Sequence, residues 1–521
     1  MIVDVTSAGK PLVHSWSRCV GAGRANEGLR AGWLEQLALS RRECGFEYVR
    51  FHGLFHDDMF VYRLHDGVEV FNWQYVDDLF DRMLDLGVRP FVELSFCPGD
   101  LATVAGTCFW WKGNGSPPKD YAKWGELVER FARHCVERYG LDEVRQWYFE
   151  VWNEPNLHAF WSGTRSEYFE LYRFSAEALK RVDARLRVGG PATSNFVADV
   201  RFDGEKETPN VGAELLKTKD LTTLNWRPVW VEPFLAFCAA NALPVDFVSM
   251  HPYPTDFAMD TTGKWHGRSR DVGSTARDLA HLRQLVQASP FPQAEIHLTE
   301  WSSSPGCRDF THDYPMAATY IVRCNIESSG LADSLSYWAF TDVFEEMGAG
   351  DTIFHGGFGL INFQGIVKPA FHAYRFLHAL GDEELFREDG WVVTRHSASG
   401  KLTAMAWHYP PEYSGSPNST GGHAATDAIL HTGTATTMNQ KLTRLPAGAA
   451  FAIETVDEDH GFTVRAWQAM GCPEPPDRRQ TQLLREAANN TGRRIVRAND
   501  DGVLDLGLAM KPWAVTMVQQ I

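Results

Sequence analysis

The chain has 521 residues, of which 44% are hydrophobic and 22% are charged, and this composition excludes a disordered or collagen-like protein. It carries 50 Lys and Arg residues against 66 Asp and Glu residues, a net charge of −16, with no densely basic stretch. Nucleic acid is therefore not an expected partner. No apolar run approaches the roughly 20 residues of a membrane span, so a membrane is not expected either.

The N-terminal segment has an acid at Asp4 and no apolar run of signal-peptide length, so we expect no secretory signal. The nine cysteines are spread along the chain without a CxxC pair. This usage indicates buried thiols, not a disulfide or zinc framework. Together these features predict a cytoplasmic protein.

Residues 1 to about 380 alternate between short apolar runs and longer amphipathic stretches, which is typical of repeated βα units around a parallel sheet. The predicted strands are Pro11–Val20, Glu47–His52, Arg89–Ser95, Gln146–Trp152, Leu186–Gly190, Asp246–His251, Glu295–Glu300 and Ser334–Phe340. Helices are predicted at Asn72–Leu86, Asp120–Tyr139, Ser166–Asp183 and Ser274–Gln287. Because eight parallel strands close a TIM barrel, we predict an α/β protein with a catalytic (β/α)8 barrel at residues 1–380.

Beyond about residue 380 the pattern changes to short runs separated by Gly, Pro, Asp and Ser, which is typical of a β-sandwich. The predicted strands here are Trp391–His396, Leu402–His408, Ala450–Thr455, Phe462–Ala466 and Ala514–Val518. We predict an accessory β-sandwich domain at residues 381–521, with which residues 1–8 can pair through the strand-like Ile2–Val5. The segment Tyr409–Thr437 is rich in Ser, Gly and Thr and is predicted to be a long loop or a partly disordered insertion.

Polar residues follow several predicted barrel strands, where a TIM barrel carries its functional groups. Asn153 and Glu154 end strand four and Glu300 ends strand seven, so both carboxylates are expected to face one pocket. Glycoside hydrolysis needs such a pair. One carboxyl group is protonated and donates its proton to the leaving oxygen, and the other is ionised and attacks the anomeric carbon or activates water. A single Glu could merely cap a helix or lie solvated in a loop, but the pair favours catalysis. Asn153 suits a hydrogen bond to the sugar 2-hydroxyl.

Two further patterns bear on the site. Arg50 lies near the end of strand two and is always charged. We predict that it lies behind the pocket and that its positive charge keeps the Glu300 carboxylate ionised. His52 and His56 with the acids at 57–58 have the spacing of metal ligands on a helix, but His52 ends a strand and Gly53 breaks any helix. We therefore predict no metal and no cofactor.

Several ordered segments resemble those of family 39 glycoside hydrolases, the β-xylosidases and α-L-iduronidases of clan A. They are Trp152–Leu157, His251–Pro254 and Thr299–Ser302. Others match the β-xylosidase branch, namely Arg50–Gly53, Ser116–Tyr121, Phe344–Glu346 and Phe354–Leu360. The resemblance covers about residues 10 to 380 and implies the barrel fold and a retaining mechanism.

By matching residue to residue, the resemblance implies that Glu154 is the general acid/base and Glu300 the nucleophile. The other site positions that it implies are His52, Phe109, Asn153, Trp161, His251, Tyr253 and one of Glu345 and Glu346, of which Glu346 is favoured. In this interpretation Phe109 and Trp161 flank the sugar ring. Trp161 could instead belong to the barrel core, but the sugar-contacting role is favoured for it. Tyr253 would contact the nucleophile and His251 would lie beside the acid/base.

The resemblance implies an exo-acting β-D-xylosidase that removes terminal xylose from xylobiose and short xylo-oligosaccharides. An α-L-iduronidase or α-L-arabinosidase on the same barrel is an alternative. A uronic acid needs a cation near its carboxylate, and residues 245–259 contain no Lys or Arg. A non-catalytic carbohydrate-binding protein is a second alternative, disfavoured because both carboxylates are present. The oligomeric state is left open.

Overall fold

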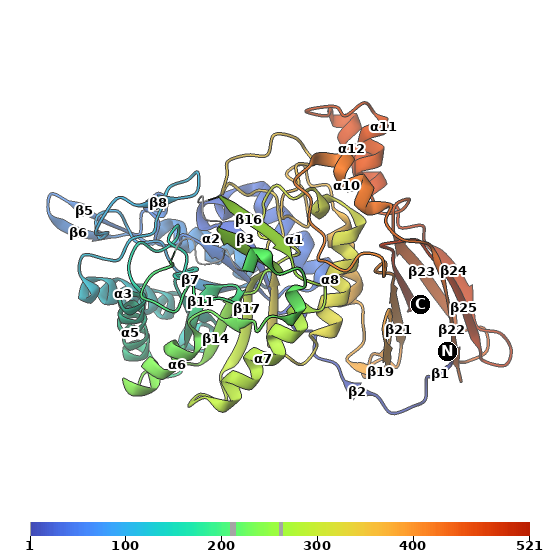
Figure 1. The fold of residues 1–521 in the computed structure, drawn as a ribbon, viewed down its shortest axis with the longest axis horizontal. Helices are drawn as coiled ribbons and strands as arrows, with labels where there is room; N and C mark the ends of the chain where they lie inside the picture. Colours follow the sequence, from blue (N-terminus) through green and yellow to red (C-terminus); the bar gives the residue numbers. More distant parts are fainter. Residues whose placement is uncertain (1, 209–214, 260–263) are drawn as a thin grey trace.

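The computed structural model describes residues 2–208, 215–259 and 264–521. Within these residues, parallel strands form a closed barrel in which neighbours in sequence are neighbours in space (Figure 1). The barrel strands are β3 (Cys19–Arg24), β4 (Tyr48–His52), β7 (Arg89–Leu94), β10 (Tyr148–Val151), β11 (Arg187–Ser194), β14 (Phe247–His251), β17 (Glu295–Trp301) and β18 (Ser334–Tyr337). This arrangement confirms the predicted (β/α)8 barrel.

Helices cover the outside of the barrel, and each of the four predicted helices is present within two residues of its predicted bounds. They are α1 (Ala31–Cys44), α2 (Gln74–Asp85), α3 (Tyr121–Tyr139), α4 (Leu141–Val144), α5 (Arg165–Val182), α6 (Val231–Ala240), α7 (Ser274–Ala288), α8 (Pro315–Glu327) and α9 (Pro369–His378). Local sequence fixes where they begin. The Asp120 carboxylate caps α3, and Thr164 forms a capping box with Glu167 at the start of α5.

The first and fifth barrel strands differ from their predicted bounds. The first strand begins at Cys19 and not at Pro11. It contains Gly21, which leaves room for the Trp338 ring, because a Cβ at this position would lie 2.2 Å from that ring. The fifth continues past Pro191 to Ser194 through an irregular register. Proline removes a ladder donor but is tolerated at such irregularities. The longer strand brings Ser194 to the mouth of the barrel.

Alternation along the strands divides the barrel interior into layers. An apolar layer near the strand starts contains Cys19, Tyr48, Phe91, Tyr148 and Phe247. Two residues further along β4, β7 and β10, the inward positions are charged: Arg50, Glu93 and Glu150 are all fully buried. The charged layer lies directly beneath the loops that follow the strands.

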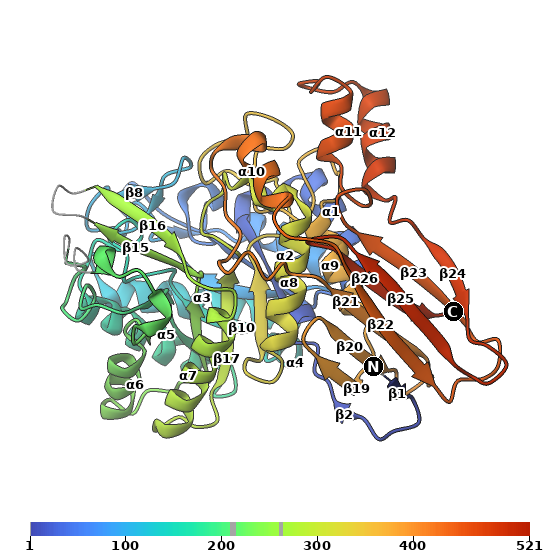
Figure 2. The same ribbon diagram turned by 45° about the vertical axis from the view of Figure 1, so that its right-hand side comes forward.

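After α9 the chain enters two further sheets, which Figures 1 and 2 place beside the barrel with both termini. The larger has the order β2-β19-β20-β21-β26-β23-β24 and the smaller the order β1-β22-β25. Their strands are β1 (Ile2–Asp4), β2 (Lys10–Pro11), β19 (Glu383–Glu388), β20 (Trp391–Arg395), β21 (Leu402–Trp407), β22 (Thr436–Thr443), β23 (Ala450–Val456), β24 (Arg494–Arg497), β25 (Leu504–Met510) and β26 (Val515–Gln520). One hydrophobic cluster contains residues of both sheets, such as Trp391 and Leu506. The N-terminal β1 pairs in parallel with β22.

Two predictions for the C-terminal part were wrong. The segment Tyr409–Thr437, predicted to be a loop, contains helix α10 (Gly422–Leu430) and packs on the barrel, where the Ser419 N–H donates to Asp309 Oδ1 at 2.8 Å. The predicted strand Phe462–Ala466 is instead part of helix α11 (Val464–Ala469), followed by α12 (Arg478–Ala488). In α11 the buried residues Val464 and Trp467 are three positions apart, which is helical spacing.

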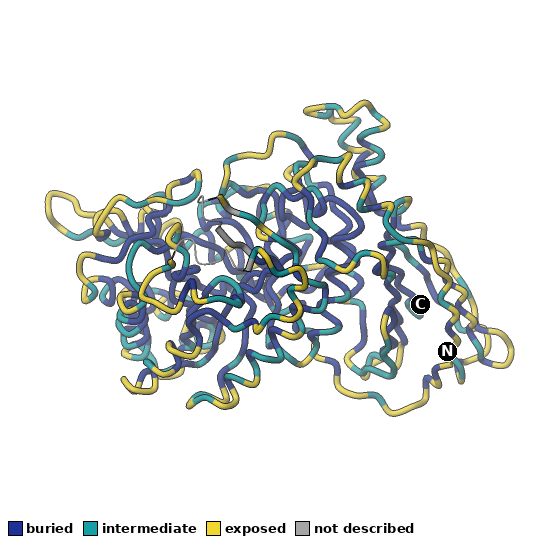
Figure 3. Tube along the Cα trace, viewed as in Figure 1, coloured by how far each residue is buried: buried dark blue, intermediate teal, exposed yellow. Residues whose placement is uncertain are grey.

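Short two-stranded antiparallel sheets extend the loops of the barrel. They are β5 (Tyr62–His65) with β6 (Val68–Phe71), β8 (Thr107–Cys108) with β9 (Gly113–Asn114), β12 (Phe196–Val197) with β13 (Arg227–Pro228), and β15 (Thr255–Met259) with β16 (Trp265–Ser269). Figure 3 shows that buried residues fill the barrel while exposed ones gather in such loops and at helix surfaces. Among the described residues, no helix has the length and apolar character needed to cross a membrane.

Candidate active site

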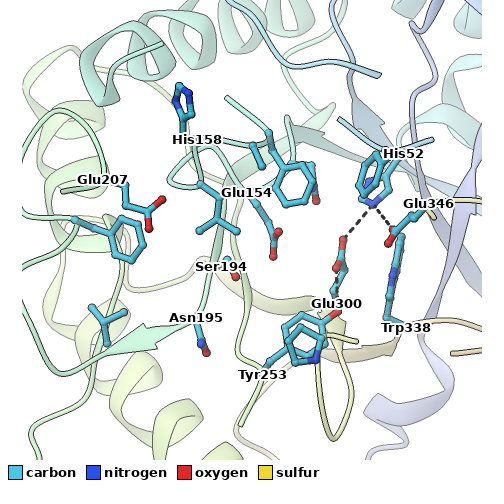
Figure 4. A pocket seen from close by; sticks show the side chains of 18 of the residues that line it. His52, Glu154, His158, Ser194, Asn195, Glu207, Tyr253, Glu300, Trp338 and Glu346 are labelled. Atoms are coloured by element: carbon cyan, nitrogen blue, oxygen red, sulfur yellow. Dashed lines mark hydrogen bonds and ion pairs between the residues drawn. The ribbon is translucent and has the colours of Figure 1, made fainter. Parts of the chain in front are cut away.

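A cavity of about 390 Å³ opens where the barrel strands end (Figure 4). The ends of the barrel strands β4, β11 and β17 and the loops after β7, β10, β11, β14, β17 and β18 contribute to it, as expected for the functional face of a TIM barrel. The lining includes His52, Phe109, Asn153, Glu154, Ser194, Asn195, Tyr253, Glu300, Trp338 and Glu346. Polar groups therefore converge in a largely buried, concave site.

Glu154 follows β10 in a left-handed backbone conformation, with φ of +44°. A non-glycine residue adopts this conformation at some cost, and here the Glu154 N–H donates to the Ala192 carbonyl at 2.8 Å. The carboxyl Oε1 lies 3.0 Å from His251 Nδ1. Burial raises the pKa of Glu154 to about 7, although a hydrogen bond from Ser194 opposes the shift. This carboxyl group can thus hold a proton near neutral pH.

Glu300, on β17, has a different set of partners. The Arg50 guanidinium donates to Oε1, and the Tyr253 hydroxyl donates to Oε2 at 3.0 Å. Burial raises the pKa of Glu300, while the nearby cationic guanidinium of Arg50 opposes that rise. Both donors stabilise the charged form, so Glu300 ionises more readily than its neighbour Glu154.

Arg50 is fully buried and joins the charged layer to the cavity. Its Nε donates to Glu150 Oε2 at 2.8 Å, and its Nη2 lies 2.9 Å from Asn153 Oδ1 and 2.7 Å from Glu93 Oε2. With Glu300 as a further acceptor, one planar guanidinium fixes four side chains. Only arginine presents donors in this forked geometry.

One end of the cavity is formed around His52. Its Nδ1 lies 2.8 Å from Glu93 Oε2, and its Nε2 lies 3.6 Å from both Glu300 Oε1 and Glu346 Oε1. Burial alone would lower the pKa of His52, but Glu93 and the other two carboxylates raise it to about 10. The imidazole is therefore a cation between acids, with its Nε2–H directed into the cavity.

Aromatic rings bound this end. The Phe109 ring stacks on His52 with centroids 5.5 Å apart, and the Trp338 ring lies 4.8 Å from the same imidazole. Figure 4 shows a second end on the far side of Glu154, with His158, Asn195 and Glu207. The two carboxylates thus lie between two differently lined halves of one cavity.

The two carboxylates are close together. One oxygen of Glu154, one of Glu300 and a ring nitrogen of His251 all lie within 4.8 Å of one another. Retaining glycosidases set their carboxyl groups about 5 to 5.5 Å apart, whereas inverting enzymes need about 6.5 to 9.5 Å to admit a water. The same three groups could ligate a metal, but Arg50 already occupies Glu300 Oε1 and the cationic His52 lies beside it, so the donor set does not fit one.

The structure separates the site residues predicted from the sequence into three groups. Those that line the cavity are His52, Phe109, Asn153, Glu154, Tyr253, Glu300 and Glu346. Arg50 and His251 lie behind that lining, fully buried. Trp161 and Glu345 belong to neither group.

The position of Trp161 differs from the sequence-based expectation, whereas that of Glu345 agrees with the preference for Glu346. Trp161 is buried against Trp152, with ring centroids 5.0 Å apart, and does not flank the cavity. Glu345 turns away from the cavity because Arg30 donates to both of its oxygens, at 2.7 and 2.9 Å, and Arg24 donates to one at 2.9 Å. These ion pairs leave Glu346 to face the site.

Several lining residues were missed. Ser194 ends β11 and Asn195 follows it, and the polar run Thr193-Ser194-Asn195 would have indicated both had strand five been extended past Pro191. Trp338 directly follows β18 and also lines the cavity. Other missed residues lie in irregular loops without a periodic signal, namely His158, Phe160, Arg201, Phe202 and Glu207.

A (β/α)8 barrel with two close carboxylates at the C-terminal ends of its strands defines a glycoside hydrolase. The family model described as "Glycosyl hydrolases family 39" matches residues 1–504, and the chain therefore belongs to this family.

The chain is similar to several β-xylosidases. It is 36% identical to a β-xylosidase of Geobacillus stearothermophilus over 99% of this chain and 95% of the relative. It is 42% identical to a β-xylosidase of Caldicellulosiruptor saccharolyticus over 71% of this chain and 69% of the relative. Its fold matches the crystal structure of a monomeric β-xylosidase from Caulobacter crescentus CB15 with a TM-score of 0.84 at 32% identity, over 99% of this chain and 98% of the other.

Proposed function

We propose that the protein is a retaining, exo-acting β-xylosidase that releases terminal β-D-xylose from xylobiose and short xylo-oligosaccharides. The similarity to β-xylosidases along nearly the whole chain supports the substrate. The observation that carries the mechanism is the close pair of carboxylates with opposite surroundings. Glu300 accepts from a guanidinium and a phenol, whereas burial raises the pKa of Glu154 to about 7.

In the first step Glu300 attacks the anomeric carbon while Glu154 donates its proton to the departing glycosidic oxygen. The bond between that carbon and the leaving oxygen breaks, and an ester bond to Glu300 forms. In the second step Glu154 removes a proton from water, which attacks the same carbon and releases Glu300. Neutralising Glu300 in the ester removes a negative charge beside Glu154, which lowers the pKa of Glu154 and prepares it to act as the base.

The two halves of the cavity suit the two parts of the substrate. We assign the terminal xylose to the end formed by His52, Glu346, Phe109 and Trp338, where charged groups can bond its hydroxyls and aromatic rings can cover its faces. Asn153, held by Arg50, is assigned to the 2-hydroxyl. The leaving part of the oligosaccharide then occupies the half beyond Glu154.

A uronic acid substrate is disfavoured by the charges at the site. Among the described residues that line the cavity, Arg201 is the one lysine or arginine, and it is paired with Asp199 at 2.8 Å. The end assigned to the terminal sugar presents Glu346, which would repel a carboxylate. The cation at that end, His52, is already neutralised by Glu93, Glu300 and Glu346. An α-L-arabinosidase activity uses the same two catalytic carboxylates and differs in the sugar that fits.

A panel of aryl glycosides tests the proposal. The purified protein should turn over an aryl β-D-xyloside faster than the matched α-L-arabinoside, and an α-L-iduronide should react far more slowly. A preference for either rival would replace the proposed substrate. Absence of turnover on the whole panel would favour the binding protein.

Two further proposals concern the rest of the molecule. We infer that residues 381–521, with residues 1–8, form an accessory β-sandwich domain, which the hydrophobic cluster shared by the two sheets supports. We also infer a reducing, cytoplasmic location. It is supported by the nine cysteines, all of which are free.

A further inference from the structure

A line of hydrogen-bonded groups runs behind Glu154. Glu154 Oε1 lies 3.0 Å from His251 Nδ1, and His251 Nε2 lies 3.0 Å from Thr299 Oγ1. The Thr299 hydroxyl in turn lies 2.7 Å from Glu150 Oε1. His251, Thr299 and Glu150 are fully buried, so no solvent competes for these contacts.

The far end of the line determines where its protons lie. Glu150 accepts from Arg50 Nε at 2.8 Å through its other oxygen, so both of its carboxylate oxygens act as acceptors. The single hydroxyl hydrogen of Thr299 is therefore directed at Glu150. The Thr299 oxygen is left to accept, so His251 Nε2 must carry the hydrogen that it donates to Thr299.

The near end follows from this assignment. A neutral imidazole protonated at Nε2 presents a bare Nδ1, which can only accept. Its partner at 3.0 Å, Glu154 Oε1, must then be the donor, and a carboxyl oxygen donates only when protonated. We propose that Thr299 and His251 are positioning residues that hold the catalytic proton on Glu154, Thr299 by fixing the Nε2–H tautomer of His251 and His251 by accepting from the Glu154 acid. This inference rests on the proposed acid/base role of Glu154.

The charges around the line are consistent with a neutral imidazole. Burial lowers the pKa of His251 to about 4, and the Glu300 carboxylate, 3.7 Å from Nδ1, opposes that shift only in part. The titratable and charged groups that face His251 or Glu154 from the surrounding strands and loops are Arg50, His52, Glu93, Glu150, Tyr253, Glu300 and Glu346. Of these, the cations Arg50 and His52 further disfavour a charged His251.

The arrangement acts in both catalytic steps. Before the first step, the bare Nδ1 stabilises the protonated acid. After Glu154 has given its proton to the leaving oxygen, its carboxylate faces the Nδ1 lone pair, an unfavourable contact that strengthens Glu154 as a base toward water. A histidine held in the opposite tautomer would donate to the carboxylate, which would lower the pKa of Glu154, leave less of it protonated before the first step and make it a weaker base in the second.

Replacing the hydroxyl tests this directly. Thr299→Val keeps the side-chain shape but leaves a buried Nε2–H without an acceptor, so His251 should adopt the Nδ1–H tautomer and donate to ionised Glu154. The alkaline limb of kcat/KM for an aryl β-xyloside should then move down by about one pH unit. The matched control Thr299→Ser retains a hydroxyl and should keep the wild-type limb. An unmoved limb in Thr299→Val, or an equal shift in Thr299→Ser, would overturn the proposal.

The tautomer can also be read without activity. NMR of the wild-type enzyme labelled with ¹⁵N-histidine reports the protonation of each ring nitrogen. The signals of His251 are identified because they disappear in His251→Gln, and they should show a protonated Nε2 and a bare Nδ1. A protonated Nδ1 would overturn the inference even if every variant folds poorly. Failure of the proposed function is distinguished by the aryl glycoside panel, since an inactive wild type with the expected tautomer would refute the glycosidase and leave the hydrogen-bond assignment standing.

Discussion

The two layers of the barrel interior are built from the same strands and yet do different things. On β4, β7 and β10 the first inward positions are Tyr48, Phe91 and Tyr148, and the next, two residues on, are Arg50, Glu93 and Glu150. Burying ionised groups costs folding free energy unless each is paired, whereas aromatic burial stabilises the fold. The contrast shows that residues only two positions apart on the same strands serve different purposes, the first layer stabilising the fold and the second supporting the catalytic site.

The largest effect is expected at Glu300, which the charged layer supports through Arg50. Glu300→Gln removes the nucleophile, and kcat/KM for an aryl β-xyloside should fall by at least about 10⁴-fold. The melting temperature should change little, because the amide keeps most of the packing. In the wild type a slow fluoro-sugar substrate should label Glu300, and a label mapped to another carboxylate would contradict the assignment.

Removing the acid/base should give a loss that depends on the substrate. Glu154→Ala should lower turnover by about 10² to 10⁴-fold for poor leaving groups, which need a proton, and far less for activated ones. Added azide should restore turnover by replacing water in the second step. Equal losses with both kinds of leaving group would assign Glu154 another role.

The pH profile should show the two carboxylates separately. Activity requires ionised Glu300 and protonated Glu154, so it should rise with pH through an acidic limb and fall again as pH passes about 7, where burial has raised the pKa of Glu154. Glu154→Gln cannot ionise, and it should lose the alkaline limb while keeping the acidic one. If the alkaline limb survives in this variant, it belongs to a different group.

The apolar layer should respond in the opposite manner. Phe91→Ala removes an aromatic side chain that stacks on Tyr148, with ring centroids 4.7 Å apart, and should lower the free energy of unfolding by about 3 to 5 kcal/mol. The kcat/KM of the folded fraction should remain close to that of the wild type. Denaturant unfolding measures the first quantity and active-site titration corrects the second. A large loss of kcat/KM in the folded fraction would show that the layers are not independent.

The smallest effect separates two neighbours in sequence. Glu346→Gln should lower kcat/KM by about 10 to 100-fold, since a hydrogen bond between a charged group and the sugar is lost. Glu345→Gln, its matched control, removes only ion pairs to Arg24 and Arg30 outside the cavity and should change kcat/KM by less than about threefold. The reverse order would place Glu345 at the sugar.

The strand-end residues could be predicted from the sequence because parallel strands direct their last side chains to one mouth. This rule was enough to bring Glu154, Glu300 and His52 together from positions far apart in the chain. It could not decide between Glu345 and Glu346. The direction of each depends on Arg24 and Arg30, more than 300 residues away in sequence.

Other features depended on packing that no local pattern encodes. Pro191 was interpreted as a strand end, but the register irregularity beside it lets β11 continue to Ser194. The sequence cannot distinguish Trp161 from an aromatic residue that binds a sugar. Only its contact with Trp152 in the structure shows that it belongs to the core. The line from Glu154 to Glu150 could not be predicted either, because it depends on the contacts that the Thr299 side chain makes with His251 and Glu150.

The central claim is that two carboxylates set close together act by double displacement, and the stereochemistry of the first product tests it most directly. Proton NMR of the reaction with an aryl β-xyloside, recorded before mutarotation, distinguishes the two anomers of xylose. Attack by Glu300 followed by water inverts the anomeric carbon twice, so β-xylose should form first. If α-xylose forms first, a single inversion has occurred, and Glu300 is not the nucleophile.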